Sequence, residues 1–356
     1  MKKKEPTSAR RVTMKDIASA AGVSAMTVSL GLRNHPKLPE STRKRIRRLA
    51  AKMGYRPDPA LSALVAYRQR HAAASAGETL AWVTNWPTPD GWRNPTYESY
   101  FQGVCERAEQ LGYRVEHFWL RERGMNRARF ERILGARNIR GLILAPHPKA
   151  HSRLNLTWER YSAVKIGYTT SHPPLHLVTA SDYRSMITAL DRLRRHGYRR
   201  IGCLLDASVD ARVEHIWLGA FLSDQHVHNT GAAVPPLLIR GTQKRRFQAW
   251  LKANRIEAVV TTYGSFLNME KWCEELGIRI PRDIGAAIMS NVQIDGRVSG
   301  IHGHPKHIGE NAVDVLTGML YLNQRGIPKI PRRIMIDGIW VEGKTVRSVR
   351  AVTPRA

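Results

Sequence analysis

The sequence predicts a small α-helical domain followed by a larger α/β body with two lobes and parallel sheets. Three observations support this class of fold. Residues 13–30 have the spacing of a helix-turn-helix, strand-like and helix-like segments alternate from Leu80 onward, and the alternation forms two series that meet near residues 177–182. Strands that alternate with helices indicate parallel sheets, and two such series indicate two lobes.

Residues 13–30 read TMKDIASAAGVSAMTVSL. Thr13 and Asp16 have the spacing of a capping box, and one apolar stripe follows at Met14, Ile17, Ala18 and Ala21. Gly22 breaks the first helix, and Ser24 is a suitable N-cap for a second. The outward face of the second helix, which would reach base edges in a major groove, carries Ala25, Met26, Ser29 and Leu30. The alternative is a pair of packed helices in an ordinary bundle.

A third helix is predicted from Pro39 and Glu40 to Gly54, and its inner face carries Ile46, Leu49, Ala50 and Met53. Its outer face is basic, with Arg43, Lys44, Arg45, Arg47, Arg48 and Lys52. A run of charge is usually only a solvated face. Here residues 1–72 hold 17 Lys and Arg but 4 Asp and Glu, a balance that suits a phosphate backbone.

A short helix is predicted after the third, because Asp58 is a good N-cap and Pro59 a good first helical residue. This helix is too short to be stable alone in water, so we expect it to need a partner chain or DNA. Residues 68–79 then read as a flexible linker.

Residues 13–64 resemble the DNA-binding headpiece of the lactose-repressor/galactose-repressor (LacI/GalR) family of bacterial transcription factors. The matching segments are Lys15–Ala18, Ala21–Ser24, Thr27–Ser29, Thr42–Arg43 and Gly54–Pro57. The resemblance implies a hinge helix that folds on operator DNA and inserts one leucine into the minor groove. By register that leucine is Leu64, with Leu61 one turn earlier. The implied DNA contacts are Thr13, Ser24, Ala25, Met26, Thr27, Ser29, Leu30, Arg33, Asn34, Leu61 and Leu64.

Two series of elements are predicted in the body. The first has strands at 80–84, 114–120, 141–145 and 163–168, with helices at 97–111 and 126–137. The second has helices at 184–196, 213–223, 243–254 and 266–276, with strands at 201–205, 237–240, 258–262 and 284–290.

The body is similar, more weakly, to the regulatory domain of the same family at His196–Gly202, Gly277–Ile284 and Pro305–Leu316. The resemblance implies the fold of periplasmic sugar-binding proteins, dimerisation, and a small-molecule effector between the lobes. The family commonly has an Arg where this chain has Trp217 and an Asp where it has Ser290. The implied effector contacts are Trp86, Asp182, Trp217, Ser290 and Asn291. A sugar stacked on an indole, another kind of ligand, and no ligand at all remain open.

Composition and the remaining motifs limit the classes of protein to which this chain could belong. The chain has 356 residues, a net charge of +28, and no apolar run long enough to span a bilayer. Cys105, Cys203 and Cys273 are odd in number and widely spaced, which indicates a reducing cytoplasm. The spacing of His302, His304 and His307 would suit a metal, but imidazoles at a crossover need not converge, so we expect no metal. The sequence shows neither a phosphate-binding glycine loop nor a paired general acid and base, so we expect neither a cofactor nor an enzyme.

These observations predict a headpiece over residues 1–56, a hinge and linker over 57–79, and an effector-binding and dimerisation domain over 80–356. We expect a cytoplasmic homodimer, with a tetramer left open, that binds a pseudo-palindromic double-stranded operator, represses transcription and does not bind a membrane. Two alternatives remain: a constitutive DNA-binding regulator whose body only dimerises, and an enzyme fused to a headpiece.

Overall fold

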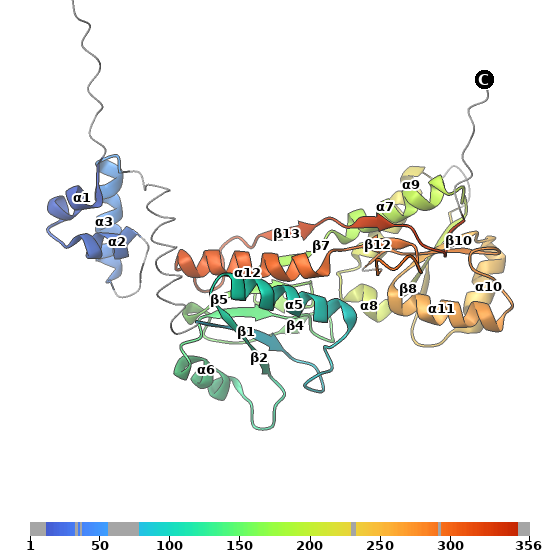
Figure 1. Ribbon diagram of the computed structural model, residues 1–356, viewed down its shortest axis with the longest axis horizontal. Helices are drawn as coiled ribbons and strands as arrows, with labels where there is room; N and C mark the ends of the chain where they lie inside the picture. Colours follow the sequence, from blue (N-terminus) through green and yellow to red (C-terminus); the bar gives the residue numbers. More distant parts are fainter. Residues whose placement is uncertain are drawn as a thin grey trace, which may run out of the picture.

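The computed structural model describes residues 12–32, 35, 38–55, 78–228, 233–290 and 293–347. Within them the chain forms an N-terminal domain of three helices and a body of two lobes, each built on a six-stranded sheet (Figure 1). The predicted fold class, a helix-turn-helix domain with a two-lobed body of parallel sheets, is confirmed.

The N-terminal domain consists of α1 (Met14–Ala21), α2 (Ala25–Leu32) and α3 (Glu40–Lys52). Apolar side chains from all three helices form its core: Ile17, Ala18, Val28, Ile46 and Ala50. Gly22 ends α1 with a φ of 62°, in the left-handed region that favours glycine. Gly22 therefore allows the chain to turn sharply between α1 and α2.

The first lobe is built on a parallel sheet in the order β13-β7-β5-β3-β1-β2. Its strands are β1 (Thr79–Thr84), β2 (Arg114–Trp119), β3 (Gly141–Leu144), β5 (Ser162–Ile166), β7 (His176–Ala180) and β13 (Arg333–Ile336). Alternate residues of β1 serve opposite faces: Leu80 and Trp82 pack with α5 (Pro95–Gln110) and α12 (Pro305–Tyr321), whereas Ala81 and Val83 pack with α6 (Arg127–Ala136). Beside this sheet lie the strand pair β4 (Ser152–Arg153) and β6 (Thr170–His172) and the single turn η1 (Trp158–Arg160).

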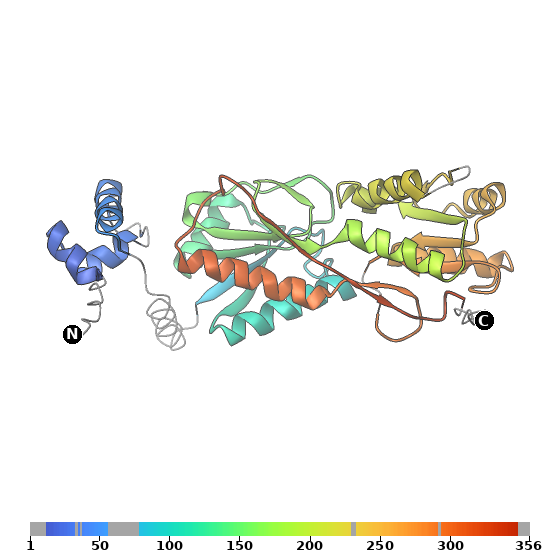
Figure 2. The same cartoon turned by 90° about the horizontal axis from the view of Figure 1, so that it is seen from above.

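α5 and α12 lie side by side on one face of the first sheet (Figures 1 and 2). Their backbones approach closely where two glycines face the other helix. A Cβ on Gly103 would lie 2.0 Å from the carbonyl oxygen of Lys306, and a Cβ on Gly309 would lie 2.0 Å from that of Tyr100. This crossing therefore requires glycine at both positions.

The second lobe has the sheet order β14-β12-β11-β10-β8-β9. Its strands are β8 (Ile201–Asp206), β9 (Leu237–Ile239), β10 (Ala258–Thr261), β11 (Gly285–Ile288), β12 (Gly300–His302) and β14 (Ile339–Val341). All its pairs are parallel except β12 with β14. One face packs with α7 (Asp182–Arg195) and α9 (Ile216–His228), the other with α10 (Lys244–Asn254) and α11 (Tyr263–Glu275).

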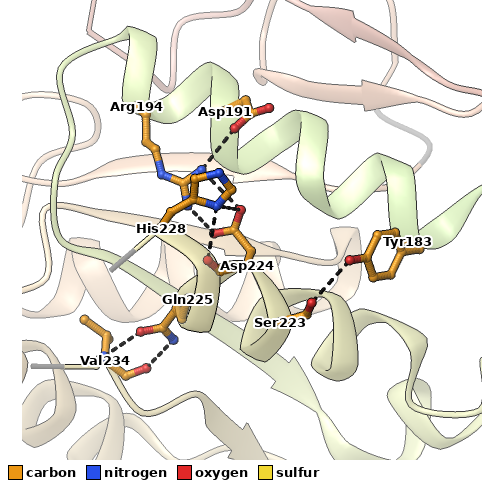
Figure 3. Close-up of polar contacts among 8 residues, drawn as sticks. All are labelled: Tyr183, Asp191, Arg194, Ser223, Asp224, Gln225, His228 and Val234. Carbon is orange, nitrogen blue, oxygen red and sulfur yellow. Dashed lines mark hydrogen bonds and ion pairs between the residues drawn. The ribbon is translucent and has the colours of Figure 1, made fainter. Parts of the chain in front are cut away.

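Polar contacts fix α9 against α7 (Figure 3). Arg194 Nη1 donates to Asp224 Oδ1 at 3.2 Å, and the Asp224 side chain is buried. Near the N-terminal end of α7, the hydroxyls of Tyr183 and of Ser223 on α9 are 3.3 Å apart. A buried carboxylate that is paired in this way holds the two helices in one register.

The chain passes between the lobes three times. The first passage runs from β7 to α7, so the predicted join near residues 177–182 is confirmed. The second runs from β12 back to α12, and the third from β13 to β14, which Figure 2 shows as the red C-terminal segment. The alternating pattern did not predict the last two passages, because 302–341 has no alternating series of its own. Only the family resemblance indicated a crossover at 302–307. The first lobe is therefore completed by residues from near the C-terminus.

Candidate functional site

Two N-caps shape the helix-turn-helix. Thr13 and Asp16 form the predicted capping box: the backbone N–H of Thr13 donates to Asp16 Oδ2 at 2.7 Å, and Thr13 Oγ1 accepts from the Asp16 N–H at 3.4 Å. Ser24 Oγ accepts from the Thr27 N–H at 3.1 Å, as expected for an N-cap of α2. Both caps predicted from the sequence are confirmed.

The outward face of α2 is mostly neutral. Ala25 is exposed and Met26 has 67% of its surface exposed, whereas Ser29 and Leu30 are half-buried. On the inner side, Val28 is fully buried in the domain core. The face that the sequence assigned to base contacts is therefore accessible, and it offers methyl and thioether groups beside hydroxyls. The DNA contacts of all these residues stay predictions, and Arg33, Asn34, Leu61 and Leu64 lie outside the described residues.

The basic residues of α3 do not all serve one purpose. Arg45 Nη2 donates to the backbone carbonyl of Ala21 at 3.2 Å, which attaches α3 to the end of α1. Lys44 is paired with Glu40 at 2.8 Å on an exposed surface. Part of the predicted basic face therefore positions the helices, and the rest supplies positive charge at the surface.

A second candidate site lies where the lobes meet. Trp86, Tyr97 and His147 come from the first lobe and Arg212 from the second, and we call these four residues the interlobe cluster. Arg212 Nη2 donates to the backbone carbonyl of His147 at 3.0 Å and to the Tyr97 hydroxyl. The Arg212 guanidinium also lies 5.7 Å from the centre of the Trp86 ring and 5.8 Å from that of Tyr97.

Local structure explains how these side chains come together. Trp86 follows the end of β1, and Trp86 Nε1 donates at 2.8 Å to the carbonyl of Pro146, just after β3. Asp206 caps α8 (Ala207–Ala211), with its Oδ1 accepting from the Ser208 N–H at 2.8 Å. Arg212 directly follows α8. The carboxyl ends of parallel strands are the usual location of ligand sites in open α/β sheets.

His147 is fully buried. Burial, followed by the charges of Arg212 and Arg121, lowers the pKa of His147 to about 4. The imidazole is therefore neutral near neutral pH, with one donor and one acceptor nitrogen. The His147 backbone N–H donates to Thr169 Oγ1 at 2.8 Å, which fixes this part of the loop.

Asp182 and Trp217 form a separate pair inside the second lobe. Trp217 Nε1 donates to Asp182 Oδ1 at 3.1 Å, and both side chains are buried. Burial raises the pKa of Asp182 to about 7, partly opposed by this hydrogen bond. Trp217, on α9, also packs in the hydrophobic core that α7 and α9 form with the second sheet. This placement favours a packing role over the predicted stacking role.

The residues predicted to bind an effector are thus only partly brought together. Trp86 is in the interlobe cluster, Asp182 and Trp217 contact each other, Ser290 follows β11 and is half-buried, and Asn291 lies outside the described residues. Sequence reasoning missed Arg212, because it sought an arginine within 215–221. A wider search upstream would have found Arg212, three residues before that segment.

The histidine cluster at the second passage between the lobes shows ring contacts. The His304 ring centre lies 5.1 Å from that of His302 and 5.8 Å from that of His307, and His307 Nδ1 lies 2.6 Å from Glu310 Oε2. Within the described ranges, no group of three His, Cys, Asp or Glu side chains has the geometry to hold a metal ion. A search of the same ranges finds no helix with the length and apolar character needed to span a bilayer.

Two family models match separate segments of the chain. Residues 13–58 match the family described as bacterial regulatory proteins, lacI family, and residues 190–346 match a periplasmic binding protein-like domain. This chain combines a LacI-type helix-turn-helix domain with a periplasmic binding protein-like domain. The lacI family match covers the helix-turn-helix. The periplasmic binding protein-like match covers the region that contains Arg212, Trp217 and Ser290.

Curated LacI-type regulators match over part of their length. The HTH-type transcriptional regulator DegA of Bacillus subtilis is 24% identical over 199 residues, which are 55% of this chain and 55% of DegA. The HTH-type transcriptional repressor CytR of Escherichia coli is 26% identical over 208 residues, which are 57% of this chain and 55% of CytR. The match therefore spans about half the length of each relative.

Solved LacI-type structures show the same fold over nearly the whole chain. A transcriptional regulator CelR in complex with cellobiose superposes with a TM-score of 0.57 at 16% identity, covering 94% of this chain and 100% of CelR. A lac repressor dimer bound to operator and an anti-inducer gives 0.55 at 18% identity, covering 94% and 99%. At these identities the likeness concerns the fold.

Proposed function

We propose that this protein is a sequence-specific transcriptional regulator, a repressor, that binds a pseudo-palindromic operator as a homodimer. The observation that carries this proposal is the helix-turn-helix itself. Thr13 and Ser24 cap its two helices, and the outward face of α2 is left accessible beside a basic third helix. An accessible helix of this kind enters a major groove, and the basic side chains near it bind phosphates.

Dimerisation would follow from the way such domains recognise DNA. One α2 covers only a few base pairs, so useful affinity and specificity need two headpieces on one operator. The lac repressor structure that shares this fold is a dimer bound to operator, which supports the same arrangement here. We assign the headpiece to 1–56, the hinge and linker to 57–79 and the dimerising body to 80–356, in the cytoplasm and without catalytic activity.

A small-molecule effector would act between the lobes. The residues we assign to it are Arg212, Tyr97 and His147 with the predicted Trp86, Ser290 and Asn291. Asp182 and Trp217, which were also predicted, contact each other, and we assign them to packing beside this site. Arg212 connects the lobes through contacts that a bound molecule would replace or extend. The similar CelR structure is a complex with cellobiose, which supports ligand binding by this fold.

A constitutive regulator is the second candidate. The observation in its favour is that Trp217 and Asp182 satisfy each other within the second lobe. In that case the body would dimerise, and no small molecule would change operator affinity.

The test is selection from a random pool of DNA duplexes by the full-length protein. We expect an inverted repeat whose two halves are related by the two-fold symmetry of the dimer. A pool without enrichment, or enrichment of a single asymmetric element, would contradict the proposal. As a control, Met26→Asp, which introduces a negative charge on the exposed face of α2, should abolish the enrichment without changing the headpiece core.

A further inference from the structure

Buried polar atoms without partners gather where the lobes meet. Neither ring nitrogen of His147 has a hydrogen-bond partner among the described residues, although its side chain is fully buried. The Nε of Arg212, whose Nη2 bonds to the His147 carbonyl, is also buried and unpartnered. Because a buried polar atom without a partner is costly, such atoms on two touching residues indicate a missing partner at this place.

The Arg212 guanidinium gives the interlobe cluster a positive charge that no neighbouring carboxylate among the described residues neutralises. Arg212 donates only to neutral acceptors, the Tyr97 hydroxyl and the His147 carbonyl, and over the described ranges no carboxylate lies within ion-pair distance of it. Glu214, two residues further on, is instead paired with Arg333 of the first lobe at 3.8 Å. A partly buried guanidinium without a counter-ion favours an anion as the missing partner.

His147 adds a second requirement. Its imidazole is neutral near neutral pH, because burial and the nearby cations disfavour a further positive charge. A neutral imidazole offers one donor and one acceptor, and a hydroxyl group can satisfy either of them. The ligand therefore needs a hydroxyl as well as an anionic group.

We propose that the interlobe cluster binds a small hydroxylated anion, a molecule that carries a carboxylate or phosphate for Arg212 and a hydroxyl for His147. This inference rests on the proposed effector-responsive regulator and adds the chemical class of its effector. The planar guanidinium pairs with either kind of oxyanion through two parallel hydrogen bonds. Arg212 belongs to the second lobe and His147 to the first. A ligand that contacts both residues would therefore change the relative position of the two lobes when it binds.

The experiment uses the full-length protein and matched sets of sugars. Glucose, galactose and mannose are each compared with the corresponding uronate and 6-phosphate, at equal ionic strength, by thermal shift and tryptophan fluorescence. We expect at least one charged sugar to bind about tenfold or more tightly than its neutral counterpart. The uronate and phosphate arms then show which oxyanion is preferred.

Variants of Arg212 provide the second arm. Arg212→Gln should reduce binding of the charged sugar to the level of the neutral one, and Arg212→Lys should restore only part of it, because lysine lacks the fork geometry. The matched control is Arg245→Gln on α10. Arg245 is exposed, so this substitution removes the same charge at a position outside the interlobe cluster and should leave binding of the sugar unchanged. If Arg212→Gln fails to fold, the comparison of charged and neutral sugars on the native protein still decides.

Three results would overturn the inference: neutral sugars that bind as tightly as charged ones, charged sugars that none of the assays detects at millimolar concentration, or an Arg212→Gln protein that binds the charged sugar undiminished. Operator binding, measured on the same preparations, separates the two proposals. If the protein binds operator and a neutral sugar releases it, the regulator stands and the anionic ligand fails.

Discussion

Trp217 Nε1 donates a hydrogen bond of 3.1 Å to Asp182 Oδ1, and this bond joins α9 to the first residue of α7. Both side chains are buried, so the carboxyl group of Asp182 has exchanged water for an indole N–H and an apolar core. Asp182 begins the helix by which the chain enters the second lobe. The pair therefore connects α9 to the point where the chain enters that lobe.

Asp182 should make the stability of the body depend on pH. Its folded pKa of about 7 lies above the usual 3.8, so the folded protein holds a proton that the unfolded chain has lost. Stability from this group is therefore greatest below the unfolded pKa and falls as the pH rises through the window between the two values. Asp182→Asn keeps an acceptor for Trp217 and carries no charge. The unfolding free energy of wild type should fall between about pH 5 and about pH 8, and that of the variant should not fall for this reason. The difference between the two proteins should therefore shift by about 1–3 kcal/mol in favour of the variant over this range.

Urea unfolding at those two pH values measures this difference. The lowered pKa of His147 acts in the opposite direction, since stability from that group rises with pH from about 4 towards 6.5. His147 is present in both proteins, so its effect cancels in the comparison. A variant with the same pH dependence as wild type would mean that Asp182 is ionised throughout.

The crossing of α5 and α12 gives a prediction about glycine. Gly309→Ala would place a methyl group 2.0 Å from the backbone carbonyl of Tyr100 and should cost about 1–3 kcal/mol of stability. Gly318 lies further along the same helix, is exposed, and has no heavy atom within 4 Å of an added Cβ. Gly318→Ala should instead stabilise by about 0.5–1 kcal/mol, because alanine favours the helix. Thermal or urea unfolding compares the two, and equal effects would refute this account of the crossing.

Operator specificity should depend on thymine methyl groups. Met26 is exposed and Leu30 half-buried on the outward face of α2, where apolar side chains contact the thymine C5-methyl in a major groove. Replacing thymine by uracil at outer half-site positions should weaken binding by about 1 kcal/mol or more at one of them. Met26→Ala or Leu30→Ala should remove that difference. Binding that is insensitive to uracil at every thymine would exclude this mode of recognition.

The proposed hinge concerns Leu61 and Leu64, which lie outside the described residues. By register Leu64 is the minor-groove wedge, so Leu64→Ala should weaken operator binding and reduce DNA bending while the headpiece stays folded. Leu61→Ala is the matched comparison, one helical turn away. Gel-shift affinity and a bending assay measure both. If only Leu61→Ala loses bending, the wedge is Leu61 and the register is wrong.

Local elements were predictable from the sequence because their signals are local. The caps at Thr13 and Ser24, the break at Gly22, and the strand at 79–84 each depend on residues within a few positions of one another. The alternation of strands and helices then predicted the parallel sheets and the first passage between the lobes. Such patterns are fixed by backbone geometry and burial, whichever ligand the protein binds.

Contacts distant in sequence were not predictable in the same way. Arg212 meets Tyr97 across 115 positions and His147 across 65, and no periodicity links such residues. Trp217 was expected in the effector site because of its position in a family pattern, yet its indole N–H contacts a carboxylate 35 residues earlier. The return of α12 to the first lobe likewise depends on the close approach at Gly103 and Gly309, which a single sequence does not reveal.

The central claim is that α2 reads a DNA sequence, and the ratio of two affinities tests it most directly. Full-length protein is titrated at physiological salt with the selected duplex and with the same duplex after both half-sites are scrambled. Base contacts should make binding to the intact duplex about 1,000-fold or more tighter. Equal affinities that fall together as salt rises would show that the basic surface alone binds DNA, and would contradict the account.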